Sequence, residues 1–206
     1  ETSLPGYAPG NWSCDGGTQA GSTISVPQHT SVTCSITNDD IAPKLHLRKV
    51  VVNQNGGTAT VADFTLKADG AGANDLSGTS PVDSGAALKA DTFALSETSA
   101  VGYTASAWGC VGGSQSGSSI TVGIGAEATC TITNTDVAPL LTLVKTVVND
   151  NGGTATAADF GLSAKAATGS APPAQEAGDG EALGHVLARV PEVVLILARG
   201  RDVVPH

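Results

Sequence analysis

Aromatic and charged side chains are scarce in this chain. Only 3% of its 206 residues are aromatic, 14% are charged and methionine is absent, whereas glycine accounts for 26 residues. Strong helix formers are sparse before the C-terminus, while Ser, Thr, Ala and Val are common. This composition favours strands and turns over helices, so we expect an all-β protein.

Basic residues and long apolar runs are also in short supply. Ten Lys and Arg stand against nineteen Asp and Glu, which leaves a formal net charge of -9 and no positive surface for nucleic acid or anionic lipid. The longest apolar stretch, residues 193–198, is far shorter than a membrane-spanning helix requires. We therefore predict neither nucleic-acid binding nor membrane insertion. The chain opens on Glu1 without a leader segment, so we expect a processed or internal piece of a longer protein.

The chain has four cysteines, with no CxxC spacing and no histidines clustered near them. This pattern argues against a zinc site, and we predict no metal and no other cofactor. The even number instead predicts two disulfides and a location outside the cytoplasm, in the extracellular space or on a cell surface. Because the two pairs share a separation of 20 residues, we predict the bonds Cys14–Cys34 and Cys110–Cys130.

A repeat with a period of 96 residues relates the two cysteine pairs. Residues 1–41 match residues 97–137 at 20 of 41 positions, and residues 42–69 match residues 138–165 at 19 of 28. Such identity predicts one fold that occurs more than once. Pairs related by the shift include Glu1 and Glu97, Tyr7 and Tyr103, Trp12 and Trp108, Asn38 and Asn134, and Lys49 and Lys145.

Proline-containing joints at residues 36–43 and 132–139 set the boundaries of the repeat. Proline has no backbone N–H to donate to a neighbouring strand, so it suits a short, stiff linker between repeats. We expect residues 1–41 to be the C-terminal part of one repeat, 42–137 a complete repeat and 138–165 the N-terminal part of another. Residues 166–206 have a different composition and no counterpart in the repeat. This tail is of unclear origin, and we expect it to be either helical or disordered.

Within the complete repeat, apolar residues alternate with polar ones, which is typical of half-buried strands. About seven such strands in about 95 residues fit a small antiparallel β-sandwich of immunoglobulin-like size. The Asn-Gly-rich segments 53–57 and 149–153 are predicted to be hairpin turns between the first two strands. The expected fold class is thus all-β, with tandem β-sandwich repeats and an atypical C-terminal tail.

Three of the apolar rows contain a polar residue. Lys49 follows two inward-facing leucines, Glu97 ends the row of Phe93 and Leu95, and Asn134 ends a row near Cys130. Unpaired polar groups are costly to bury, so the three side chains are predicted to meet inside the sandwich. The alternative is that each lies at a strand end and extends its polar group into water.

This three-part pattern resembles the CnaB-type, SpaA-like prealbumin-fold repeats of bacterial surface adhesins and pilins. The resemblance rests on Lys in LHLRK and LTLVK, Glu in ETSAVGY and ETSLPGY, and Asn in TCTITN and TCSITN. It implies a prealbumin-like fold and a spontaneous isopeptide bond between Lys49 and Asn134, assisted by Glu97 as the catalytic residue. Burial disfavours the charged forms of Lys49 and Glu97, which suits such a reaction.

We therefore interpret the chain as a structural stalk repeat of a secreted or surface-anchored adhesin-like protein. Its expected partners are neighbouring repeats of the same protein, with head-to-tail self-association through the incomplete repeats at residues 1–41 and 138–165. We do not predict an enzyme, because an isopeptide bond forms once without turnover. The alternative is an adhesin module that contacts a glycan or host protein through its loops, for example residues 70–84.

Overall fold

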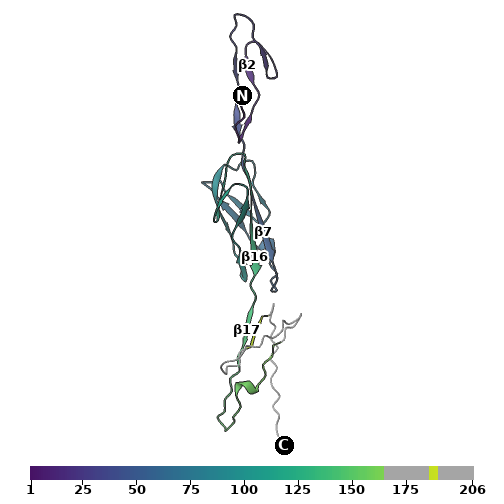
Figure 1. The fold of residues 1–206 in the computed structure, drawn as a ribbon, viewed down its shortest axis with the longest axis vertical. Helices are drawn as coiled ribbons and strands as arrows, with labels where there is room; N and C mark the ends of the chain where they lie inside the picture. The colour runs from purple at the N-terminus through teal and green to yellow at the C-terminus, as the bar shows by residue number, and fades with distance from the viewer. Residues whose placement is uncertain (165–185, 190–206) are drawn as a thin grey trace. The chain divides into compact units, whose positions relative to one another are not determined.

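A computed structural model describes residues 1–164 and 186–189 of the chain (Figure 1). These residues form strands and turns, together with two single-turn helices, η1 (Val61–Asp63) and η2 (Ala157–Asp159). They divide into two compact units, one made of Glu1–Val52 and Ala59–Asn134 and the other of Asn53–Thr58 and the described residues from Thr135 onward. The predicted all-β class is confirmed.

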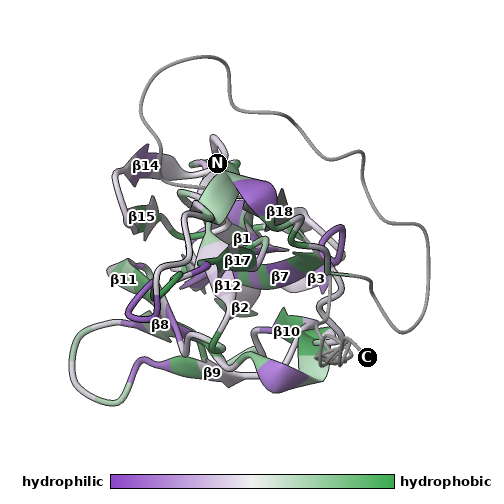
Figure 2. Ribbon diagram, turned by 90° about the horizontal axis from the view of Figure 1, so that it is seen from below, coloured by the Kyte–Doolittle hydropathy of each residue, from purple (hydrophilic) through white to green (hydrophobic). Residues whose placement is uncertain are grey.

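Two five-stranded sheets form the central part of the chain. One has the order β10–β7–β16–β12, with β13 also paired to β16, and the other has the order β14–β15–β11–β8–β9. Figure 2 shows the second set of strands following one another in a curved layer beside β7 and β10. The strands are β7 (Lys44–Val52), β8 (Leu66–Asp69), β9 (Leu76–Gly78), β10 (Val82–Asp83), β11 (Asp91–Glu97), β12 (Tyr103–Ala105), β13 (Gly109–Val111), β14 (Ser114–Ser116), β15 (Ser119–Val122) and β16 (Glu127–Asp136).

The core lies between the two sheets and follows the alternation expected from the sequence. Every second residue of β7 is buried from Leu45 to Lys49, and every second residue of β16 is buried from Ala128 to Asp136. The rings and branched chains of the opposite sheet, including Phe93 and Leu95, pack against them. Because each square ångström of apolar surface removed from water contributes about 25 cal/mol, these rows hold the two sheets together.

The segment 53–57 is a connection between the sheets and not the hairpin turn that its sequence predicts. The strand before it, β7, and the strand after it, β8, belong to different sheets. The buried carboxylate of Asp136 holds the segment, because it accepts backbone N–H hydrogen bonds from Gln54 at 2.8 Å, Asn55 at 2.7 Å and Gly57 at 2.8 Å. The turn residues are therefore fixed by the last strand and not by a hairpin partner.

These hydrogen bonds set the charge state of Asp136. Burial by itself would raise the pKa of the Asp136 carboxyl. The backbone N–H groups of Gln54, Gly57 and Asn55 stabilise the carboxylate more strongly, so its pKa lies below the ordinary value. Asp136 thus remains a carboxylate that accepts hydrogen bonds over the physiological pH range.

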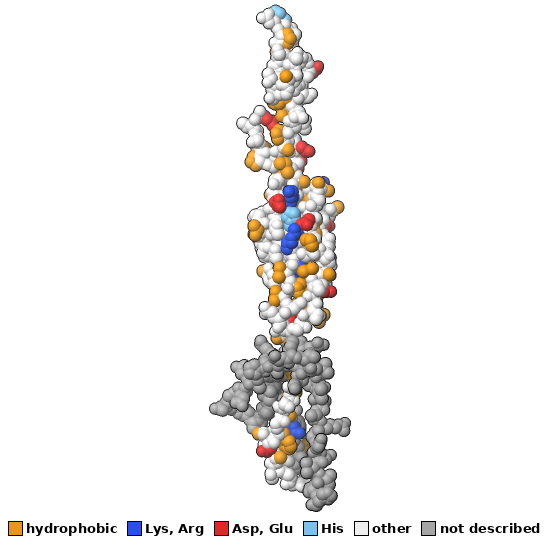
Figure 3. Space-filling model, turned by 90° about the vertical axis from the view of Figure 1, so that its right-hand side faces the viewer, with side chains coloured by type: hydrophobic (Ala, Val, Ile, Leu, Met, Phe, Trp, Pro, Cys, Tyr) orange, Lys and Arg blue, Asp and Glu red, His pale blue; other side chains and the backbone are white. Residues whose placement is uncertain are grey.

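Charged side chains cross the outer face of the β10–β7–β16 sheet. His46 places Nδ1 2.5 Å from Asp83 Oδ1 and Nε2 3.2 Å from Glu127 Oε1. Arg48 donates to Asp83 at 2.6 Å and Lys44 lies 3.7 Å from Glu127. Lys, Arg, His, Asp and Glu side chains gather in this way on the face shown in Figure 3. These charged side chains form a ladder that joins β7, β10 and β16. Within it, the hydrogen bonds from Arg48 and then His46 hold the pKa of Asp83 below its usual range.

The segment 70–84, expected to be a loop, contains two edge strands. Residues Leu76–Gly78 form β9, which pairs with β8, and Val82–Asp83 form β10, which pairs with β7. Between them, the hydroxyl of Ser80 accepts a hydrogen bond from the Lys49 N–H at 3.0 Å. The segment therefore completes one edge of each sheet.

Residues 1–41 form three two-stranded pairs that correspond, at the shift of 96, to parts of β12–β16. The registers match, because Cys14 pairs with Cys34 as Cys110 pairs with Cys130. In order, the pairs are β1–β6, β2–β5 and β3–β4. Their bounds are β1 (Tyr7–Pro9), β2 (Ser13–Asp15), β3 (Thr18–Ala20), β4 (Thr23–Ser25), β5 (Thr33–Ser35) and β6 (Asn38–Asp40).

After the joint at 137–139, β17 (Leu140–Leu143) pairs antiparallel with β18 (Val186–Arg189). Four residues of the C-terminal tail thus form a strand, where a helix was one of the two expectations. The rest of residues 166–206 lies outside the described residues. Among the described residues, no helix has the length and apolar character needed to cross a membrane.

Replacing Asp136 by Asn is expected to lower the melting temperature by several degrees, because the neutral amide offers one acceptor oxygen where the carboxylate offers two. A depressed pKa contributes stability above the pKa of an unfolded Asp, about 3.9, and this contribution is lost as the pH falls through the folded value. The acid-induced loss of stability should therefore be smaller in Asp136→Asn.

Thermal unfolding followed by circular dichroism from neutral pH to below pH 4 measures both effects. Asp69→Asn, on the exposed face of β8, is the control and should leave both unchanged. If Asp136→Asn had the wild-type melting temperature and the wild-type loss of melting temperature at low pH, the carboxylate would not be what holds the segment 53–57.

Candidate functional site

The amine of Lys49 lies in the interior of the sandwich. Lys49 is the next inward-facing residue of β7 after Leu45 and Leu47, so the strand directs its side chain between the sheets. That side chain is 0% exposed, and Nζ donates a hydrogen bond to Oε2 of Glu97 at 2.5 Å. Glu97 reaches this position from the end of β11 in the opposite sheet, with its side chain 7% exposed. The alternative, a lysine extending into water, does not describe Lys49.

Two aromatic rings, Phe64 and behind it Tyr103, lie beside the Lys49 amine. The Lys49 Nζ atom lies 4.3 Å from the ring centroid of the fully buried Phe64. Phe64 in turn contacts Tyr103 edge to face, with 5.8 Å between the ring centroids. The Tyr103 hydroxyl accepts a hydrogen bond from the Ala59 N–H at 2.9 Å, which fixes the ring. A ring face supports a cation or an amine, and it keeps water from the site.

Asn134 occupies the strand next to β7. It lies on β16, is 1% exposed and belongs to the inward-facing row of that strand. Its Oδ1 atom and the Oε1 atom of Glu97 are buried without a hydrogen-bond partner, and they are the two such side-chain atoms in the described part of the chain. Buried acceptors without partners cost free energy, so each of these two atoms calls for an explanation.

The structure thus buries Lys49 and Asn134 and covers most of the Glu97 side chain, and it places Lys49 and Glu97 in direct contact. β7 and β16 lie side by side in one sheet (Figure 1), while β11 brings Glu97 from the other. The chemical set consists of an amine that can act as nucleophile, a carboxyl group that can carry a proton and a carboxamide that can be attacked. Phe64 and Tyr103 were not predicted as part of the site, although both recur in the repeat, as Phe160 and Tyr7.

Both predicted disulfides are present. Cys14 is joined to Cys34 and Cys110 to Cys130, and each pair joins directly opposite residues of neighbouring strands. A bond that closes a loop of about 20 residues contributes on the order of 3 kcal/mol through the entropy of the unfolded chain. Gly112, two residues after Cys110, has a φ of +81°. A Cβ added there would lie 2.1 Å from the Glu127 carbonyl oxygen, so only glycine fits.

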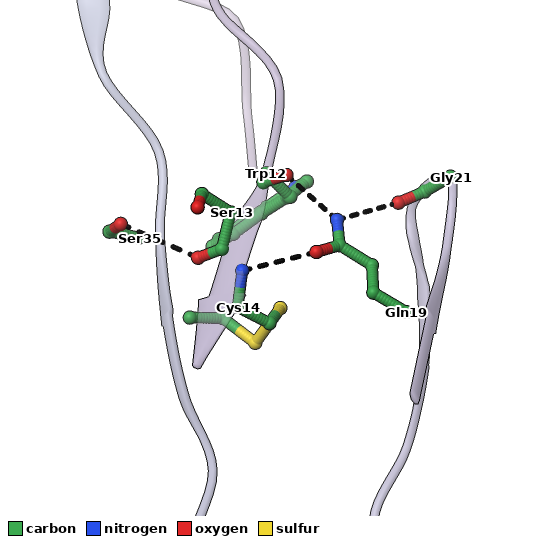
Figure 4. The surroundings of a disulfide bond; sticks show 7 residues. Trp12, Ser13, Cys14, Gln19, Gly21 and Ser35 are labelled. Carbon is green, nitrogen blue, oxygen red and sulfur yellow. Dashed lines mark hydrogen bonds between the residues drawn. A yellow bond between two sulfur atoms is a disulfide. The ribbon is translucent and has the colours of Figure 1, made fainter. Parts of the chain in front are cut away.

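A glutamine beside each disulfide was missed by the sequence analysis. Figure 4 shows Gln19, whose Oε1 accepts from the Cys14 N–H at 3.1 Å while Nε2 donates to the carbonyls of Trp12 at 2.7 Å and Gly21 at 2.9 Å. The same three bonds recur around Gln115 in the complete sandwich, to Cys110, Trp108 and Gly117. The signal in the sequence is the identity of Gln19 and Gln115 under the shift of 96.

Comparison with known proteins gives one family. The family model of the SpaA-type prealbumin-like fold domain matches the chain over residues 1–36, 40–132 and 136–189. Among solved structures, the major pilin protein (T3.2) from Streptococcus pyogenes serotype GAS13637 is similar, with 13% sequence identity and a TM-score of 0.38. The similarity covers 66% of this chain and 64% of the length of that pilin. No curated protein matches.

Replacing Gln115 by Ala is expected to lower the free energy of unfolding by about 1–3 kcal/mol, because it removes three hydrogen bonds and leaves the partly buried Trp108 carbonyl without its donor. Denaturant unfolding of the oxidised protein measures the loss. Gln54→Ala, on an exposed side chain, is the control and should change little. Equal midpoints for the two variants would show that Gln115 does not hold the disulfide-bonded strand.

Proposed function

Because the chain belongs to the family of SpaA-type prealbumin-like fold domains, we propose that it is a structural stalk segment of a secreted or surface-anchored bacterial protein. In this proposal the complete sandwich is closed by the Cys110–Cys130 disulfide and by an isopeptide bond between Lys49 and Asn134. The observation that carries the proposal is the Lys49 amine, which lies wholly buried against Glu97. Its role is to extend and to resist unfolding, with no catalytic turnover.

The tandem organisation is supported by three features. The second and third family matches begin at residues 40 and 136, which are 96 residues apart. The hydrogen bonds of Gln19 recur at Gln115, and both cysteine pairs share one register. We therefore assign residues 1–41, 42–137 and 138–165 to three successive repeats. The described tail strand Val186–Arg189 lies in the third family match, which extends to residue 189.

The proposed reaction uses the three buried side chains in turn. Lys49 transfers a proton toward Glu97, to which it is already hydrogen-bonded, and its neutral Nζ attacks Cγ of Asn134. Glu97, once protonated, polarises the amide and gives its proton to the departing nitrogen, and it then accepts the second proton that Nζ loses as the new amide forms. The C–N bond of the Asn134 amide breaks, the new C–N bond to Lys49 forms and one ammonia leaves. No oxidant or cofactor is consumed, and Phe64 shields the amine from water.

Such a bond suits a stalk because it connects the first strand of the sandwich to the last. Lys49 lies on β7 and Asn134 on β16, with 85 residue steps (134 − 49) between them. Closing a loop of this length removes more unfolded-chain entropy than the 20-residue loop of the disulfide, on the order of 4 kcal/mol in the same approximation. A force applied to the ends of the repeat would therefore pass through adjacent strands and leave the closed loop folded.

Peptide mapping tests the proposed bond. After reduction and tryptic digestion, wild-type protein should yield a branched peptide of residues 49–67 joined to residues 90–145, because trypsin cannot cleave after a modified Lys49. Lys49→Arg and Asn134→Ala should abolish it. Glu97→Gln should largely abolish it, because the proton relay is lost while the shape is kept. All three variants should also melt at lower temperature than wild type.

Lys67→Arg, on the exposed face of β8, is the matched control and should retain the cross-link and the melting temperature, and its branched peptide should still end at residue 67 because trypsin also cleaves after Arg. Two linear peptides from folded, oxidised wild-type protein would refute the isopeptide bond. The family assignment and the disulfides would stand in that case, and the stalk function would rest on them alone.

A further inference from the structure

The segment 53–57 contains an asparagine followed by a glycine, a pair whose chemistry the proposed function does not use. Asn55 precedes Gly56, which has no side chain and a φ of 93°. In an Asn–Gly pair the glycine nitrogen can attack the side-chain carbon of the asparagine, because no Cβ on the second residue obstructs the approach. The pair is therefore a candidate site for spontaneous modification of the chain.

The structure holds the side chain of this asparagine in place. Asn55 is half-buried, and its Nδ2 atom donates to the backbone oxygen of Asp136 at 2.9 Å and to Oδ1 of the same residue at 3.3 Å. Its backbone N–H donates to the other carboxylate oxygen, Oδ2, at 2.7 Å. Asp136 is itself only 5% exposed. One buried residue of β16 thus binds both the main chain and the side chain of Asn55.

These contacts oppose the reaction in the folded protein. The Nδ2 atom must leave as ammonia, so both of its hydrogen bonds to Asp136 have to break. Asp136 has no proton to give to the leaving nitrogen, because burial, which raises its pKa, is outweighed by the backbone N–H groups that lower it. The attacking N–H of Gly56 has no hydrogen-bond partner among the described residues, so no base is in contact with it. The reaction therefore requires the segment to open first.

The product of the reaction would not fit the same place. The amide of Asn55 is the donor in its side-chain contacts with Asp136, whereas a carboxylate can only accept hydrogen bonds. A carboxylate at position 55 would also bring a second negative charge against the buried carboxylate of Asp136, and like charges at this separation repel. The modified segment would therefore leave its position on β16.

We propose that Asn55 is a site of spontaneous deamidation, that its contact with Asp136 keeps it unreacted in the folded protein, and that the reaction, once it occurs, releases the segment 53–57 from β16. The modification goes beyond the proposed function and does not depend on the isopeptide bond. It gives the connection between the two sheets a one-way chemical change that accumulates with the age of the molecule.

The reaction needs water as its only co-reactant. The Gly56 nitrogen attacks Cγ of Asn55, its proton passes to Nδ2, the bond between Cγ and Nδ2 breaks and one ammonia leaves. The product is a five-membered succinimide ring. Water then adds to either ring carbonyl, and the bond from that carbon to the ring nitrogen breaks. This step leaves aspartate or isoaspartate at position 55.

The rate of deamidation tests the protection. Wild-type protein is incubated at mildly alkaline pH, either folded or in urea, and the tryptic peptide that ends at residue 67 is sequenced by mass spectrometry. Deamidation at Asn55 should be about tenfold slower, or more, in the folded protein, because a hydrogen-bonded segment has to open. Folded Asp136→Asn, well below its melting temperature, should react several-fold faster than wild type. Asp75→Asn removes a carboxylate that holds a different turn and should keep the wild-type rate.

A variant that carries the product charge tests the release of the segment. Asn55→Asp should melt at a lower temperature than wild type, because its carboxylate faces Asp136. Gln54→Glu adds the same charge one residue earlier, on an exposed side chain, and is the matched control that should melt like wild type. Wild-type protein aged until Asn55 has reacted should show the lower melting temperature of Asn55→Asp.

Each part of the proposal can fail separately. Equal rates at Asn55 in folded protein and in urea, or in folded wild type and Asp136→Asn, would overturn the protection by Asp136. An unreacted Asn55 even in urea would overturn the site itself. A wild-type melting temperature in Asn55→Asp would overturn the release of the segment. Sequencing of the peptide assigns each loss of ammonia to its own residue, so these outcomes are independent of a cross-link at Lys49.

Discussion

The burial of one amine determines much of this structure. Lys49 lies between two sheets with no exposed side-chain surface, and it is held by Glu97 and by the ring of Phe64. An ammonium group is costly to remove from water, so the site must supply either a permanent counter-charge or a reaction that eliminates the charge. A neutral amide bond to Asn134 would remove the charge of Lys49. The unpartnered Asn134 Oδ1 atom would become the carbonyl oxygen of that amide.

The remaining features act on β7 and β16, the strands that carry Lys49 and Asn134. Asp136 continues the inward-facing row of β16 and fixes the turn that follows β7. The disulfide holds β13 to β16, and the outer ladder around His46 joins β7 to β10 and β16. With few aromatic residues to build a core, the domain concentrates its fixed contacts on its first and last strands. These are the strands through which a stalk would transmit force.

The sequence allowed the fold class, the cysteine pairs and the burial of Lys49 and Asn134 to be predicted, because each depends on a period of two or on a matched spacing. The hairpin at 53–57 was wrong, since Asn-Gly sequences suit several turns and the contact that decides among them, Asp136, lies about 80 residues away. Gln115 and Tyr103 were missed for the same reason, because their partners are backbone atoms that leave no mark in the sequence. Only their recurrence as Gln19 and Tyr7 could have identified them.

The intact mass of the reduced, denatured monomer tests the central claim most directly, because it reports whether the buried amine has lost its charge to an amide bond. Folded wild-type protein, reduced only after purification, should be lighter than its sequence by the mass of one ammonia, and Lys49→Arg should show the full sequence mass. A wild-type mass equal to that of the sequence after reduction would contradict the account and leave Lys49 as a buried lysine paired with Glu97.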